Sequence, residues 1–385
     1  MKITHIEYFT LKCSVPENYP KPIASFVKDG SIFLRVYTDT GITGIGEPSP
    51  YGAPLKDMVK ILKDIFIPNW VGCNPLDIKK LTLQPALSFG YGNLGQNALI
   101  AGFSQALWDI YGKFKNKPVF KLINPKSNGR IKAYASAGMW YDHTPLEDVV
   151  NEALGFLDMG FDVYKLRPET PIGSGNHFKR NLNPPRVNLK RFVTLLQKIN
   201  IATEGNLKIM VDAGCRLNFD EALYLGKVMD ELNCVFLEEP IVRDYNKFSK
   251  LKKNLKTALA SGESLVSKSQ FVPWIENNAL DYLQPDANLA GINEIIEIDK
   301  IAKIKGLKIA LHNWTNDINN AANVHLGSAL ETCEVVEANL THNPLKNNLL
   351  EEEIILKEGE YKLSNKPGLG IKLNEAVLDK YAFNL

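Results

Sequence analysis

The sequence lacks several features that would assign it to common classes of protein. It has no run of about 18 apolar residues that could cross a membrane. The N-terminal MKITHIEYFTLK has polar residues where a secretory signal needs an apolar core. The 45 basic and 43 acidic residues nearly balance, for a net charge of +2, and no basic block stands out for nucleic acid. We therefore expect a globular cytoplasmic protein with neither a membrane nor a nucleic-acid partner.

Cysteine is also scarce. The five cysteines are odd in number and share no metal-type spacing; they are Cys13, Cys73, Cys215, Cys234 and Cys333. Reduced thiols explain this pattern best, which argues against a disulfide framework or a cysteine-based metal site.

A strand is missing where a dinucleotide site would need one. GYGNLG, residues 90–95, matches G-x-G-x-x-G, but KKLTLQPALSF precedes it, with Pro85 inside the run. Asp109, at the distance of a ribose-binding acid, lies in a helical pattern. We predict no dinucleotide cofactor.

What the sequence does contain first is a mixed unit of strands and helices. ITHIEYFTLKC and SIFLRVYTDTGITGIGEPSP alternate as antiparallel strands do, with a hairpin at residues 39–41. Helical spacing follows over 55–66 and over about 96–115. An α+β unit is therefore predicted for roughly residues 1–125.

From residue 131 onward, strand and helix patterns alternate, which predicts βαβ units and a parallel sheet. Eight strands suit a (β/α)8-type barrel. The candidates are 131–139, 161–168, 207–214, 234–240, 258–264, 280–286, 307–313 and 333–339. Beyond about residue 345, GEYKLSNKPGLGIKL predicts a short strand, a turn and a tail that packs back on the first unit.

Carboxylates recur at the ends of three successive strands. Asp212 ends one, Glu238 and Glu239 end the next, and Glu263 ends the third. Strand ends of a parallel barrel surround its active site, and three anions confined there would repel one another. A divalent cation removes that cost, and ligands that are all oxygen favour Mg²⁺. Since neighbours on a strand face opposite sides, only one of Glu238 and Glu239 can easily enter the mouth.

Two further pairs belong to the same mouth. Asp286 and His312 end the next two strands, and an Asp beside a His orients the ring and raises its basicity. In VYKLRP, Lys165 and Arg167 are two residues apart and so share one face of a strand. Taken alone, this pair is more typical of a solvated stripe than of two cations facing an anion.

Taken in order, these motifs resemble the enolase superfamily, and specifically its mandelate racemase subgroup. The resemblance covers essentially the whole chain, including ALWDIYGK (106–113) and the PGLGIKL tail. It implies an α/β fold: a modified TIM-type (β/α)7β barrel with an N-terminal α+β capping domain. The implied division is 1–125 for the capping domain, 126–345 for the barrel and 346–385 for a segment packing back on the capping domain.

The resemblance also implies roles for single residues. The implied Mg²⁺ ligands are Asp212, Glu238 and Glu263. Asp286 and His312 would form the catalytic dyad. Glu337, in CEVVEAN, stands where the family has a Glu hydrogen-bonded to the substrate carboxylate, and Glu331 and Glu334 compete for that place. The muconate-lactonizing branch carries a lysine after the sixth strand, and QPDAN has none.

The family removes the proton α to a carboxylate, with Mg²⁺ stabilising the enediolate. Mandelate racemase has a lysine base where this chain has Arg167, whose guanidinium holds its proton near neutral pH. With His312 as the single base, we expect syn-dehydration of an acid sugar, aldonate or aldarate, to a 2-keto-3-deoxy acid. Lys165 and Arg167 would then bind the anionic substrate.

Three other readings stay open: a racemase or epimerase of a 2-hydroxy acid, a ring-opening cycloisomerase of an anhydro sugar acid, and a protein that only binds its ligand. Loops 15–31 and 50–54 are expected to close over the barrel. The insert 169–186 contacts a distal hydroxyl or second carboxylate, or is a solvated loop. We also expect a small-molecule carboxylate substrate and a homo-oligomer.

Overall fold

The structure is a computed structural model. It describes residues 1–15, 19, 21, 29–50, 52–89, 94–169, 187–343, 345–346 and 348–385, with the backbone alone for 84–89. Most of loop 15–31, Tyr51 of loop 50–54, most of GYGNLG and nearly all of the insert 169–186 lie outside the described residues. Within those residues, no helix is long and apolar enough to span a bilayer. The five cysteines are free thiols.

The N-terminal strands form a three-stranded antiparallel sheet in the order β1-β2-β3. They are β1 (Ile3–Leu11), β2 (Ser31–Thr38) and β3 (Thr43–Gly46). Gly41, with a φ of +79°, makes the predicted turn between β2 and β3. Strand β3 lies directly on a long helix, because a Cβ on Gly46 would overlap the carbonyl oxygen of Gly102.

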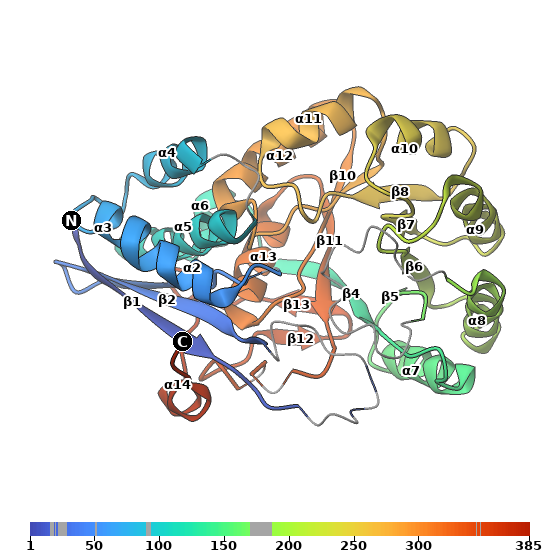
Figure 1. Cartoon of the computed structure of the whole chain (residues 1–385), viewed down its shortest axis with the longest axis horizontal. Helices are drawn as coiled ribbons and strands as arrows, with labels where there is room; N and C mark the ends of the chain where they lie inside the picture. The colour runs from blue at the N-terminus through green and yellow to red at the C-terminus, as the bar shows by residue number, and fades with distance from the viewer. Residues whose placement is uncertain are drawn as a thin grey trace.

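Helices complete this N-terminal unit, which we call the capping domain (Figure 1). They are α2 (Leu55–Ile61), a π-helical turn (Leu62–Phe66), α3 (Ile67–Trp70), α4 (Ile78–Phe89), α5 (Leu94–Phe114) and α6 (Val119–Ile123). The segment before GYGNLG is thus helix α4, so the strand that a dinucleotide fingerprint requires is absent there.

Eight parallel strands follow and close into a barrel, because β11 pairs with β4. They are β4 (Arg130–Gly138), β5 (Val163–Leu166), β6 (Lys208–Asp212), β7 (Phe236–Glu238), β8 (Ala258–Ser261), β9 (Tyr282–Leu283), β10 (Lys308–Leu311) and β11 (Cys333–Asn339). Each predicted strand is present, and the predicted fold class is confirmed.

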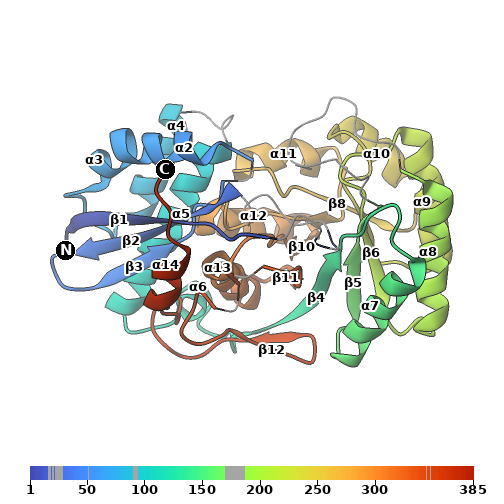
Figure 2. The same ribbon diagram turned by 60° about the horizontal axis from the view of Figure 1, so that its bottom comes forward.

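Seven helices separate the barrel strands and cover them from outside (Figures 1 and 2). They are α7 (Leu146–Asp158), α8 (Leu189–Ala202), α9 (Phe219–Glu231), α10 (Tyr245–Lys252), α11 (Lys268–Glu276), α12 (Gly291–Lys305) and α13 (Asp317–Ala329). The amphipathic segments that predicted them bury one face each, as Ala222, Leu225 and Met229 do in α9.

Side chains from alternate positions fill the barrel interior. Tyr134, Met210, Phe236, Tyr282 and their neighbours form one buried cluster inside it. This layer makes the barrel a packed core rather than a pore. The next inward position on each strand lies nearer the strand end, so polar side chains there face the mouth of the barrel.

The C-terminal segment contacts both parts of the molecule. The hairpin β12 (Ile355–Lys357) and β13 (Glu360–Lys362) extends the sheet from β4. Helix α14 (Glu375–Tyr381) packs beside β1, where the backbone nitrogen of Phe383 donates to Thr10 O at 3.0 Å. The segment thus contacts both the capping domain and the barrel, while the division at 125 and 345 stays a prediction.

Two residues without a predicted partner turn out to hold this packing together. Asp109, fully buried in α5, accepts from the backbone nitrogens of Ile45 and Leu369 at 3.2 and 2.9 Å. His325, buried in α13, accepts from Phe120 N at 3.1 Å through Nδ1, and its Nε2 donates to Leu369 O at 3.0 Å. Both side chains are structural.

We expect His325 to make the protein less stable in mild acid. Burial lowers its pKa to about 4, although the bond to Leu369 O opposes this change. The unfolded chain binds this proton below about pH 6.5, so stability present above that pH is lost as pH falls towards 4. Between pH 7 and 5 the loss is about 2 kcal/mol. Urea unfolding of wild type and His325→Gln at both pH values measures it, and identical pH dependence in the two proteins would contradict the assignment.

Candidate active site

The eight predicted site residues gather at the end of the barrel where its strands finish. They are Lys165, Arg167, Asp212, Glu238, Glu263, Asp286, His312 and Glu337. The pairing of β6 with β7 sets Asp212 directly beside Glu238. Each of the eight forms an ion pair with another of them, and the three carboxylates lie together, so the structure brings all eight predicted site residues together.

Asp212, Glu238 and Glu263 form a compact carboxylate cluster. Each can offer one oxygen, and these oxygens lie within 4.8 Å of one another. Burial raises the pKa of Glu238 to about 8; Lys165 opposes the rise and Asp212 adds to it. The crowding of like charges is the cost that a cation would remove. A group of carboxylate donors alone, without His or Cys, fits Mg²⁺.

Each carboxylate of the cluster also has a cationic partner. Arg167 Nη2 lies 2.5 Å from Asp212 Oδ2, and Lys165 Nζ lies 2.9 Å from Glu238 Oε2. The partner of Glu263 is Arg243, whose Nη2 lies 3.4 Å from Oε1. These contacts hold the three side chains in place.

Arg243 was not predicted as a site residue. Arg243 pairs with Glu239, to which its Nε donates at 2.6 Å and its Nη2 at 2.7 Å. Glu239 also accepts from Ser261 Oγ at 3.1 Å and from Cys215 Sγ at 3.3 Å. Glu239 is thereby kept out of the cluster that its neighbour Glu238 joins, as the alternation of strand positions predicts. No periodicity marked this pair in the sequence, because residues 239–243 lie in a loop before helix α10.

The dyad lies across the mouth from β6. His312 Nδ1 lies 2.7 Å from Asp286 Oδ2, and the other ring nitrogen, Nε2, lies 3.3 Å from Glu263 Oε2. Burial lowers the pKa of His312, but Glu337, Glu263 and Asp286 more than offset this and raise it to about 9. Asp286 therefore fixes the Nδ1 side of the imidazole, while Nε2 points at the carboxylate cluster.

Lys165 lies between two carboxylates at the bottom of the mouth. Its Nζ is 2.9 Å from Glu238 Oε2 and 2.9 Å from Glu337 Oε1. Burial lowers the pKa of Lys165, but these two acids raise it well above its usual range. Lys165 is therefore a permanent cation here. Of the three candidates on and beside β11, Glu337 faces the mouth, whereas Glu334 pairs with Lys308.

Arg167 lies higher in the mouth than Lys165. Its guanidinium carbon is 4.8 Å from the centre of the Trp314 ring, and its side chain is 25% exposed. Asp212 and the other acids keep its pKa above the usual range in spite of burial. Arg167 therefore cannot give up a proton near neutral pH. Lys165 and Arg167, which share one face of β5 and its end, therefore both contact acids of the mouth.

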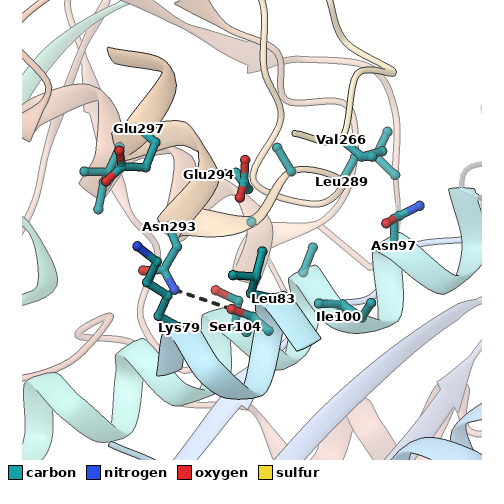
Figure 3. A pocket seen from close by; sticks show the side chains of 15 residues that line it. Lys79, Leu83, Asn97, Ile100, Ser104, Val266, Leu289, Asn293, Glu294 and Glu297 are labelled. Atoms are coloured by element: carbon teal, nitrogen blue, oxygen red, sulfur yellow. Dashed lines mark hydrogen bonds between the residues drawn. The ribbon is translucent and has the colours of Figure 1, made fainter. Parts of the chain in front are cut away.

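A separate hollow lies between α4, α5 and α12 (Figure 3). Ser104, Asn293 and Glu294 line it, and none of the eight site residues does.

The fold and the strand-end cluster define a class of protein: a (β/α)7β barrel with a capping domain and a candidate metal centre. Two families match the chain. "Mandelate racemase / muconate lactonizing enzyme, N-terminal domain" matches residues 6–124, and "Enolase C-terminal domain-like" matches residues 148–377. The chain therefore belongs to the enolase superfamily, in its mandelate racemase subgroup, and is an enzyme of that superfamily.

Relatives with curated names include two dehydratases of acid sugars. Arabinonate dehydratase of Saccharolobus solfataricus is 28% identical over 355 residues, covering 91% of this chain and 90% of that protein. D-gluconate/D-galactonate dehydratase of Picrophilus torridus is 28% identical over 360 residues, covering 92% and 88%. The solved 3,6-anhydro-D-galactonate cycloisomerase of Zobellia galactanivorans has a TM-score of 0.83 at 23% identity, with both chains fully covered, and shows the shared fold.

Proposed function

We propose that this protein is a Mg²⁺-dependent dehydratase that converts an aldonate or aldarate to a 2-keto-3-deoxy acid. The observation that carries the proposal is the single base: His312 Nε2 faces the carboxylate cluster at 3.3 Å, while the position of a second base holds Arg167. The acid sugar dehydratases at 28% identity support the substrate class and the reaction.

Asp212, Glu238 and Glu263 would hold the cation. When bound, Mg²⁺ supplies Lewis-acid stabilisation for negative charge on the substrate carboxylate. Lys165 contributes a second fixed positive charge beside Glu337, and a buried cation of this kind acts strongly on developing charge. Glu337 accepts from the backbone nitrogen of Asn313 at 2.8 Å through one oxygen and pairs with Lys165 at 2.9 Å through the other, so it holds the Lys165 cation in place beside the substrate carboxylate.

His312 carries out both proton transfers. A cation held by Asp212, Glu238 and Glu263 would offset the acids that raise the pKa of the ring, and so would favour the form with Nε2 unprotonated. In that form Nε2 takes the α-proton as the C–H bond breaks, and the resulting enediolate expels the β-hydroxyl. The imidazolium then returns a proton to that departing oxygen, so that water leaves from the same face. Asp286 holds Nδ1–H throughout and stabilises the charged ring.

Arg167 separates this reaction from racemisation. A racemase removes a proton from one face and delivers one to the other, which needs two bases. The guanidinium stays charged, is paired with Asp212 and stacks on Trp314. It therefore fits binding of the substrate anion, as the geometry of a planar donor allows.

A screen of aldonates, aldarates and anhydro sugar acids with Mg²⁺ in D₂O, followed by proton NMR, tests the function. We expect a 2-keto-3-deoxy acid from one of the open-chain sugars, and no product after treatment with EDTA. A ring-opened keto acid formed without loss of water would replace the dehydratase by a cycloisomerase. Deuterium at the α-carbon of an inverted substrate would show a second base and overturn the proposal.

A further inference from the structure

Asp286 is fixed by more than its bond to His312. Its Oδ1 accepts from Asn319 Nδ2 at 2.9 Å, from Asn323 Nδ2 at 3.3 Å and from the backbone nitrogen of Asn288 at 2.8 Å. All of these residues are buried, with exposures of 0–1%. Three donors on one oxygen fix the orientation of the carboxylate and leave the other oxygen facing the imidazole.

Asn319 also connects the dyad to the capping domain through hydrogen bonds. Its Oδ1 accepts from Gln105 Nε2 of α5 at 2.9 Å, and Gln105 Oε1 accepts from the backbone nitrogen of Glu47, directly after β3, at 2.9 Å. Gln105 and Glu47 are fully buried. A continuous chain of hydrogen bonds therefore runs from the backbone of the capping domain to the ring of His312.

Backbone groups fix the direction of this chain. The N–H of Glu47 can only donate, and the carbonyl of Ala287, which takes a bond from Gln105 Nε2 at 3.3 Å, can only accept. The amide nitrogen of Gln105 must therefore face Asn319. Asn319 in turn must direct its oxygen to Gln105 and its nitrogen to the dyad. The N–H of Ala287 orients Asn323 in the same sense, at 3.1 Å from Oδ1.

We propose that Asn319 and Gln105 are positioning residues for the base, and that the capping domain thereby sets the geometry of the dyad. The inference rests on the proposed function in that His312 is taken as the base. Donors on Asp286 Oδ1 hold the carboxylate so that Oδ2 receives the Nδ1–H of the ring. Nε2 is then left on the side of the carboxylate cluster, as proton removal requires.

The kinetic test uses the acid sugar that the screen identifies. We expect Asn319→Leu to lower kcat by about 10- to 100-fold, the usual cost of losing a bond to a charged partner behind a catalytic group, with little change in KM. Gln105→Met should lower kcat less, because the bond to Asp286 survives. In an Asp286→Asn background, Asn319→Leu should have almost no further effect, since both changes act through the same side chain. If the effects of Asn319→Leu and Asp286→Asn on kcat were additive, the proposed positioning of His312 by Asn319 through Asp286 would be wrong.

A second readout needs no substrate and so separates this inference from the proposed function. In protein labelled with ¹⁵N-histidine, the hydrogen-bonded Nδ1 proton of His312 should give a protected downfield signal, assigned by its absence in His312→Asn. Asn319→Leu and Gln105→Met should weaken or shift that signal. His325→Gln is the matched control: His325 is on the same helix, 1% exposed, and its ring nitrogens bond the backbone of Phe120 and Leu369. An unchanged signal in Asn319→Leu, or an equal change of the His312 signal in His325→Gln, would overturn the inference.

Discussion

Replacing His312 by asparagine should reduce kcat by about 10⁴-fold, the upper range for loss of a general acid–base group. The reason is that one ring serves twice, removing the α-proton and then protonating the leaving oxygen. An asparagine keeps a polar group near Asp286, whose Oδ2 is 2.7 Å from Nδ1 in the wild-type protein, but cannot accept the proton. Steady-state rates on the identified acid sugar measure the loss.

The same variant should leave metal binding intact, because His312 is not a member of the carboxylate cluster. Titration calorimetry with Mg²⁺ alone checks this point. His325→Gln is the matched control at pH 8, since His325 is equally buried but its ring bonds the backbone of Phe120 and Leu369 and stacks on the ring of Phe120, none of them site residues. Full turnover in His312→Asn would disprove the single-base mechanism. If His312→Asn still exchanged the α-proton without elimination, another base would be responsible for removing that proton.

The strand-end residues could be predicted because the barrel topology determines which residues meet at the mouth. In a closed parallel barrel, consecutive strand ends meet at one mouth, so Asp212, Glu238 and Glu263 converge although 51 positions separate the first from the last. The alternation of side chains along a strand then selected Glu238 over Glu239. Because the register of a sheet is regular, the position of a residue along its strand predicts which way its side chain points.

The supporting residues could not be predicted in the same way. DINNAANVH in α13 looks like a polar helix surface, yet Asn319 and Asn323 are fully buried. The partner of Asn319 is 214 positions away in the chain, on a helix of the capping domain. No periodicity encodes such a pair, because it depends on how two units dock. Buried amides of this kind are recognised only when their donors and acceptors can be counted in three dimensions.

Removing the ammonium of Lys165 should destabilise the protein strongly. Its side chain is 1% exposed and lies 2.9 Å from an oxygen of Glu238 and 2.9 Å from an oxygen of Glu337, both fully buried. Removing one partner of a buried ion pair leaves an uncompensated charge, and here two carboxylates lose the same partner. We expect Lys165→Met to lower the unfolding free energy by about 3–5 kcal/mol in EDTA. Urea unfolding measures the difference.

Methionine separates the charge from the packing. It preserves most of the apolar stem that lies against the ring of Tyr134, 5.3 Å from Nζ, so the loss reports chiefly the missing ammonium. Lys132→Met is the matched control: Lys132 pairs with Asp162 at the barrel surface with 65% of its side chain exposed, and its removal should cost less than about 1 kcal/mol. If both variants were equally stable, the mouth would tolerate its anions without Lys165, and the electrostatic part of the proposed mechanism would be wrong.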